Sequence, residues 1–218
     1  YSLVRPKQVP LAGETPSQAL ANRGVGYVEL RAVDVNPYSD IGIDEDTAGF
    51  LEVLALYCLM QDSPELYDQE LEDIEKNQAE VVNRGRAPNA VIIEHKKQVP
   101  ILKWMGQHLD HMQSLARVLN QTYASRIYTQ ALETMKQRIH KVDETLSAKV
   151  IQDTLSHKGT WSFGSEMANQ HAQSYEAHVL KPDTIEYFEG LAQSSLQKQQ
   201  QLEQECTQSF DEYLTAFR

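Results

Sequence analysis

One segment of this chain is predicted to be a β-strand with clear boundaries, and it constrains the fold more than any other feature. Residues Tyr27–Val35 are rich in Val, Leu and Tyr, and they are bounded by Gly26 and by Asn36-Pro37. A second short strand is possible at Ala90–Ile93. Because an isolated strand exposes unpaired backbone groups along both edges, the segment needs neighbouring strands to be stable.

Helical patterns dominate everything after Asp44. Residues Asp44–Met60 are apolar on nearly all sides, which is typical of a helix at the centre of a core, and Pro100–Tyr123 has the spacing of an amphipathic helix. Further helices are expected at Thr15–Asn22 (capped by Thr15, with Pro16 at its first position), Pro64–Asn83, Ser125–Ser156 with interruptions, Phe163–Leu180 and Asp183–Phe217. The predicted fold class is therefore α+β: predominantly helical, with one principal strand at about 27–35.

No linker rich in Pro, Gly or Ser divides the 218 residues. We expect a single unit, 1–218, that consists of a strand segment (1–43) and a helical layer (44–218).

The acidity of the chain is local. The formal net charge is −11, and the segment Asp44–Glu80 holds 12 acidic residues and one basic residue, so that the remainder is neutral. This balance argues against nucleic acid and anionic membranes as partners. The longest apolar run, Phe50–Met60, is shorter than the ~18 residues that a membrane span requires.

The chain has two cysteines, Cys58 and Cys206, too few and too far apart for a disulfide framework. Cys58 stands in the apolar run, where we expect a buried thiol. Cysteine usage favours a cytoplasmic location. His108 and His111 share one helix face, but no further ligands stand at a zinc spacing, which favours surface histidines.

The predicted strand presents two chemically useful side chains on one face. Side chains alternate along a strand, so that Tyr27, Glu29 and Arg31 share one face and Val28 and Leu30 lie on the other, which we expect to pack on the core. Glu29 and Arg31 are then ~6.5–7 Å apart along the chain. A carboxylate suits Mg²⁺ and a guanidinium suits phosphate, although by pattern alone such a pair is usually a surface ion pair.

The stretch Gly24-Val-Gly-Tyr-Val-Glu-Leu-Arg-Ala-Val-Asp-Val-Asn-Pro-Tyr38 resembles the strand-and-turn signature of the bacterial glutamate–cysteine ligase family. The Gly42-Ile43 turn, the helix Phe50–Leu59 and the block Gly85-Arg86-Ala-Pro88 are similar to the segments that follow it in that family, and the helix ending at Leu214 is similar to its tail. The resemblance covers most of the chain and corresponds to a C-terminal portion of the family's catalytic domain.

The resemblance implies an activity, partners and a fold. Members of the family use ATP to join the γ-carboxylate of L-glutamate to the amine of L-cysteine through a γ-glutamyl phosphate, with Mg²⁺, in the first step of glutathione biosynthesis. It implies that the strand belongs to an antiparallel sheet like that of glutamine synthetase, completed by the N-terminal remainder of the enzyme. The fragment alone is then expected to be inactive.

Residue by residue, the resemblance places Glu29 on a Mg²⁺-binding glutamate and Arg31 on an arginine that contacts the transferred phosphate. Asp34 and Asn36 also match the motif, and we interpret them as residues that shape and cap the turn. Two alternatives remain open: a related carboxylate–amine ligase with another acceptor, and a non-catalytic, acidic helical interaction module. The presence of both Glu29 and Arg31 argues against the second.

Overall fold

The computed structural model describes residues 3–217 and is mostly helical, with 65% of residues in helices and two small antiparallel sheets. The predicted predominance of helix is thereby confirmed. The chain divides into two parts, one spanning 35–171 and the other combining 1–34 with 172–218. The prediction of a single unit remains a prediction.

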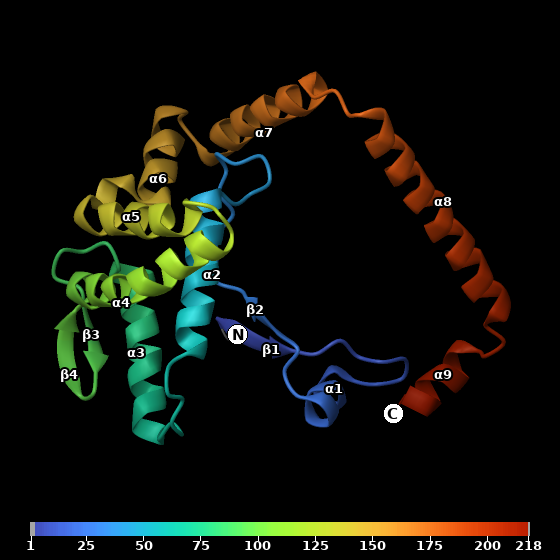
Figure 1. Ribbon diagram of the computed structural model, residues 1–218, viewed down its shortest axis with the longest axis horizontal. Helices are drawn as coiled ribbons and strands as arrows, with labels where there is room; N and C mark the ends of the chain where they lie inside the picture. Colours follow the sequence, from blue (N-terminus) through green and yellow to red (C-terminus); the bar gives the residue numbers. More distant parts are fainter. Residues whose placement is uncertain (1–2, 218) are drawn as a thin grey trace. The chain divides into compact units, whose positions relative to one another are not determined.

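The part spanning 35–171 contains most of the helices (Figure 1). Its elements are α2 (Glu45–Leu59), α3 (Asp68–Arg84), β3 (Val91–Glu94), β4 (Lys97–Pro100), α4 (Ile101–Thr122), α5 (Ile127–His140), a short 3-10 helix η1 (Val142–Glu144), α6 (Leu146–Ser156) and α7 (Thr160–Ala177), which runs past residue 171. Helices α2, α4 and α5 pack against one another, as the cyan, yellow-green and yellow ribbons of Figure 1 show.

The other part contains the first strand pair. Its elements are β1 (Val4–Lys7), α1 (Pro16–Arg23), β2 (Tyr27–Leu30), α8 (Pro182–Glu205) and α9 (Phe210–Phe217). Helix α1 begins as predicted, with the Thr15 side chain as its N-cap, Pro16 in its first turn, and Gln18 completing a capping box.

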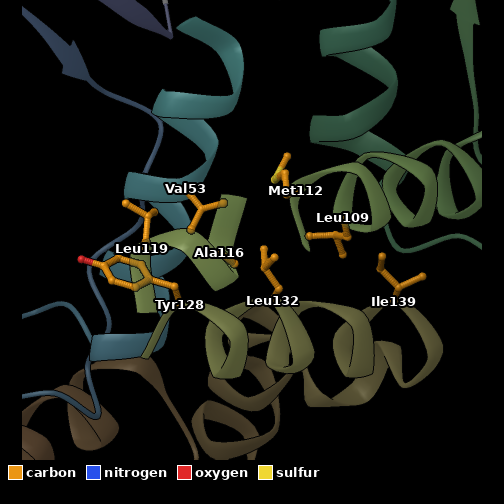
Figure 2. Close-up of a cluster of buried hydrophobic side chains, with 8 residues drawn as sticks. All are labelled: Val53, Leu109, Met112, Ala116, Leu119, Tyr128, Leu132 and Ile139. Carbon is orange, nitrogen blue, oxygen red and sulfur yellow. The ribbon is translucent and has the colours of Figure 1, made fainter. Parts of the chain in front are cut away.

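The core of the 35–171 part lies where α2, α4 and α5 meet. Val53 of α2 and Leu132 of α5 are completely buried there, and Figure 2 shows the side chains of this core from all three helices converging on the same space. The buried members are Val53, Leu109, Met112, Ala116, Leu119, Tyr128, Leu132 and Ile139. The hydroxyl of Tyr128 donates a hydrogen bond to the Glu52 carboxylate (2.9 Å), which satisfies the one polar atom that this ring brings into the core.

Gly49 of α2 packs against α5. A β-carbon at this position would lie 3.4 Å from Cγ1 of Ile127 and 3.5 Å from the β-carbon of Ala131, which is ordinary van der Waals contact. The predicted central helix is therefore confirmed as a core element, although its last residues, including Leu59 at 80% exposure, leave the core.

Three sequence predictions of local structure need correction. The strand at 27–35 is shorter, because the partner strand β1 has four residues and β2 ends at Leu30, opposite Val4. The final helix at 183–217 is divided, because Ser209 and Glu212 form a new capping interaction that starts α9. Cys58, expected to be buried, is exposed.

The strand predicted at 90–93 is confirmed as β3, but its partner β4 was not predicted. The two are joined by a tight turn in which His95 and Lys96 both adopt left-handed backbone angles (φ 47° and 65°). Because neither residue is a glycine, asparagine or aspartate, the sequence lacks the usual signal for such a turn.

We expect Leu132→Ala to lower the free energy of unfolding by about 2–5 kcal/mol, because it leaves a cavity among side chains that are already fully buried. Urea denaturation followed by circular dichroism measures this loss. The matched control, Leu155→Ala in α6, removes the same atoms from a side chain that is 74% exposed and should change stability by less than about 0.5 kcal/mol. Equal losses in the two variants would contradict the position of the core.

Candidate functional site

Strands β1 and β2 form an antiparallel pair that carries both predicted site residues. Arg5 lies opposite Glu29 and Lys7 opposite Tyr27. The pairing continues one step past β2, where the backbone N–H of Arg31 donates to the carbonyl of Leu3 (2.8 Å). Residues directly opposite each other in such a pair share a face.

The Glu29 carboxylate is half-buried and paired with a residue from the other strand. Its Oε2 lies 3.3 Å from Nζ of Lys7, and the side chains are 43% and 34% exposed, respectively. In the sequence analysis, Arg31 was the expected partner of Glu29 in a surface ion pair. In the structure, Glu29 forms its ion pair with Lys7 instead. Sequence reasoning missed Lys7 because no strand was predicted at 4–7 and the register between the two strands was therefore unknown.

The resulting face is rich in positive charge, although the chain as a whole is acidic. Arg5, Lys7 and Arg31 surround the single carboxylate of Glu29 along the two strands. Such a face attracts phosphate groups, and its one carboxylate can supply an oxygen ligand to a divalent cation. No clear sequence signal points to this face, because β1 has only four residues and one of them is a proline.

The opposite face of the pair is apolar and exposed, which corrects the expectation that it packs on a core. Val28 is 51% exposed, Leu30 is 38% exposed, and Val4 of the partner strand is 48% exposed. Within the described residues, these side chains join neither of the two buried clusters.

Hydrogen bonds centred on Glu14 and Arg23 stabilise the segment between the two strands. The Glu14 carboxylate accepts two hydrogen bonds from the Arg23 guanidinium (2.6 and 3.0 Å) and one from the backbone of Leu11. Arg23 also donates to the carbonyl of Val9. The hydrogen bond from Arg23 is the largest of the effects that lower the pKa of Glu14 to about 2.

Gly26, the residue before β2, lies close to Gln8, the residue after β1. A β-carbon at this position would lie 2.8 Å from Oε1 of Gln8, whose amide nitrogen in turn donates to the carbonyl of Gly24 (3.1 Å). A side chain at Gly26 would therefore displace the Gln8 side chain, whereas Gly24 adopts a positive φ of 71°, which a glycine tolerates most readily.

The turn after the motif is organised by Asn36, in agreement with the predicted turn-shaping role. Asn36 is buried, its amide donates to Oδ2 of Asp44 (2.9 Å), and its Oδ1 accepts from the backbone of Tyr38. Asp44 in turn caps α2 by accepting from the N–H of Thr47 (2.7 Å). Burial opposes ionisation of Asp44, but the hydrogen bonds outweigh it and lower the pKa of that carboxyl. Asp34, for which the same role was predicted, is exposed.

A polar cavity of about 350 Å³ lies beside this turn, lined by both acidic and basic side chains. At its edge the Tyr38 hydroxyl donates to the Asp153 carboxylate (2.5 Å). Burial and then this hydrogen bond raise the pKa of Tyr38 to about 12, so that the phenol is neutral under ordinary conditions.

The two histidines on α4 differ in exposure, although their rings meet edge to face with centroids 6.2 Å apart. His108 is half-buried, with Nδ1 3.2 Å from the hydroxyl of Tyr57 and its ring 4.3 Å from that of Trp104. His111 is exposed, as predicted for both.

Within residues 3–217, no group of three or more His, Cys, Asp or Glu side chains is arranged to hold a metal ion.

Comparison with known proteins gives a consistent result. The family described as glutamate–cysteine ligase matches residues 1–81. The glutamate–cysteine ligase of Azotobacter vinelandii is 36% identical to this chain over 220 residues, and that of Pseudomonas fluorescens is 33% identical over 219 residues. The resemblance to the glutamate–cysteine ligase family is confirmed. Both alignments cover the whole of this chain but 41% of the relative, so the chain corresponds to a C-terminal portion of these ligases.

The chain is also similar to solved structures. The crystal structure of the Francisella tularensis glutamate–cysteine ligase in complex with AMP matches with a TM-score of 0.87 and 28% identity, over all of this chain and 43% of that one. A bifunctional glutathione synthetase from Pasteurella multocida matches with a TM-score of 0.57 at 21% identity, which indicates a shared fold only. The relatives are named as ligases, and the family is one of enzymes.

None of the described helices combines the length and apolar character needed to cross a membrane.

We expect the Glu14 carboxyl to titrate near pH 2, well below the ordinary value for glutamate, because Arg23 stabilises its ionised form. A depressed pKa in the folded state means that the pair stabilises the fold above the pKa of an unfolded glutamate, and that this contribution is lost as the pH falls from about 5 to about 2. Carbon NMR of the side-chain carboxyl measures the titration directly. In Arg23→Gln the pKa should return towards its ordinary value; an unchanged pKa in that variant would contradict the assigned cause.

Proposed function

We propose that this chain contributes part of the active site of an ATP-dependent glutamate–cysteine ligase, which joins the γ-carboxylate of L-glutamate to the amine of L-cysteine in the first step of glutathione biosynthesis. The observation that carries the proposal is the match over the whole chain, at a TM-score of 0.87, to a ligase whose structure contains AMP. The family assignment and the charged face of the β1–β2 pair support it independently.

The proposed reaction has two steps. The γ-carboxylate of glutamate attacks the terminal phosphorus of ATP, which releases ADP and forms γ-glutamyl phosphate. The cysteine amine then attacks the acyl carbon, phosphate leaves, and a proton is lost from the nitrogen. Negative charge builds up on the transferred phosphoryl group, and a fixed guanidinium stabilises it best when its position is set before the reaction.

Arg31 is the residue proposed to contact this phosphoryl group. Its backbone is fixed by the hydrogen bond to Leu3, which places the guanidinium next to the strand pair rather than on a loose loop. Lys7 and Arg5 on the same face are proposed to attract the phosphates of ATP, a role that the sequence did not indicate. Lys7 also holds the Glu29 carboxylate in an ion pair.

Glu29 is proposed to hold Mg²⁺, which would neutralise phosphate charge when bound. Its half-buried carboxylate can supply one oxygen ligand to such a site, where Mg²⁺ would compete with Lys7 for it. Because the described residues contain no cluster of three ligands, the other ligands of the proposed site must come from outside them.

We further propose that β1 and β2 belong to a larger antiparallel sheet, like that of glutamine synthetase, formed with the N-terminal remainder of the enzyme. The exposed apolar face of Val4, Val28 and Leu30 and the 41% coverage of the relatives support this. On this proposal residues 1–218 alone do not form γ-glutamylcysteine, and the complete enzyme works in the cytoplasm.

In the complete enzyme, Arg31→Ala should lower kcat by about 100-fold or more and change the KM for cysteine much less, because the lost interaction develops only in the transition state. Arg31→Lys should recover part of the rate, since it keeps the charge but loses the planar fork. Steady-state kinetics measures both variants. The control Arg117→Ala removes an exposed arginine of α4 and should leave kcat unchanged; near-normal kcat in Arg31→Ala would refute the role of Arg31.

Glu29→Gln should weaken the Mg²⁺ dependence of the complete enzyme, and higher Mg²⁺ should partly restore the rate, because a neutral amide is a poorer ligand for a hard cation. Rates measured across a Mg²⁺ titration test this. Glu65→Gln, an exposed acidic residue, is the matched control. If Glu29 forms only a surface ion pair, its replacement costs about 0–1 kcal/mol of stability and leaves the metal dependence unchanged.

A further inference from the structure

A second cavity in the 35–171 part has the properties of a ligand site, and neither Glu29 nor Arg31 is among its lining residues. It has a volume of about 580 Å³ and lies against α2, α4 and α5, with the loop after α3 at one side. Its lining is largely apolar and includes Leu54, Trp104, Met105, Met112 and Met135. It adjoins the end of the core at which Leu109, Met112 and Ile139 lie (Figure 2).

The cavity opens to solvent, because Cys58 and Arg86 among its lining residues are exposed, and it is therefore accessible to a small molecule. Pockets for small molecules are commonly about 300–1,000 Å³, mostly apolar, with a few polar groups that fix orientation. Three methionines among the lining residues can adapt to an apolar guest, because their side chains are flexible and polarisable.

The polar residues of this cavity favour a negatively charged group. Arg86 and Arg138 contribute to the lining together with His108, whereas no Asp or Glu does, in a chain of net charge −11. Arg86 forms no ion pair or hydrogen bond with any other residue in the part of the chain that the structure describes. Arg138 is partly engaged, since its charge helps to lower the pKa of Asp44 in the neighbouring polar cavity. Arg86 is therefore the cation more available to a guest.

We propose that this cavity binds an amphipathic carboxylate, a molecule of the fatty-acid class, with its apolar body among the methionines and its carboxylate at Arg86. A carboxylate matches the planar guanidinium in geometry as well as in charge. The proposal does not depend on the ligase activity, because the cavity is formed entirely by residues 50–145, whereas Glu29 and Arg31 lie in the other part of the chain.

The two free cysteines provide a test with an internal control. Cys58 lines the cavity and is exposed, whereas Cys206 lies after α8, in the other part of the chain. Decanoate, added below the concentration at which it forms micelles, should slow the alkylation of Cys58 by iodoacetamide in a saturable manner and leave Cys206 unaffected. Mass spectrometry of the 218-residue chain measures both sites. Absence of protection at Cys58, or equal protection at both cysteines, would overturn the proposal.

Variants test the role assigned to the charge. Arg86→Gln should weaken the protection by decanoate about tenfold, because a charge-assisted hydrogen bond is lost, whereas Arg117→Gln on α4, outside this cavity, should have no effect. Decan-1-ol, with the same apolar body and no charge, should protect more weakly than decanoate and should not respond to Arg86→Gln. Equal binding of the alcohol and the acid, together with an inert Arg86→Gln, would show that the cavity does not select carboxylates.

Discussion

The arrangement of residues 35–171 depends on the carboxylate of Asp44. One of its oxygens accepts from the N–H of Thr47 and thereby starts α2, and the other accepts from the side chain of Asn36 and thereby fixes the turn that precedes it. Arg138 of α5 adds an electrostatic interaction with the same carboxylate. A single ionised group thus sets the beginning of the helix that carries Val53 into the core. Asn36 is buried because its amide completes this arrangement, which gives a physical reason for an asparagine at this point of the motif.

Much of the local structure could be predicted because the signals are local. The cap at Thr15, the strand at Tyr27 and the amphipathic pattern of α4 all lie within a few residues of the feature that they specify. The pairing partners could not be predicted in this way. Strand β1 contains a proline and has four residues, and the turn before β4 has left-handed residues without glycine, so neither gives a recognisable pattern. The exposure of Cys58 depends on how α2, α4 and α5 pack, which the apolar run alone does not determine.

In the candidate site, too, local features could be predicted from the sequence but strand pairing could not. Alternation along one strand was sufficient to place Glu29 and Arg31 on one face. The contribution of Lys7 depends on the register between β1 and β2, and so does the net positive character of that face. The acidic residues concentrated between Asp44 and Glu80 lie in the other part of the chain. The positive character of this face is therefore set by the pairing of Val4–Lys7 with Tyr27–Leu30, and it is not visible in the net charge of the whole chain.

Asn77 of α3 binds the outer edge of the β3–β4 hairpin. Its amide nitrogen donates to the carbonyl of Ile93 and its oxygen accepts from the N–H of the same residue, both at 2.7 Å. Because these are the backbone groups of Ile93 that face away from β4, the side chain takes the place that another strand would occupy. The hairpin has an apolar sequence, Val-Ile-Ile, of the kind that recruits further strands in aggregates. Asn77 therefore occupies backbone groups at the edge of β3 that an added strand would need, and α3 packs against the same strand.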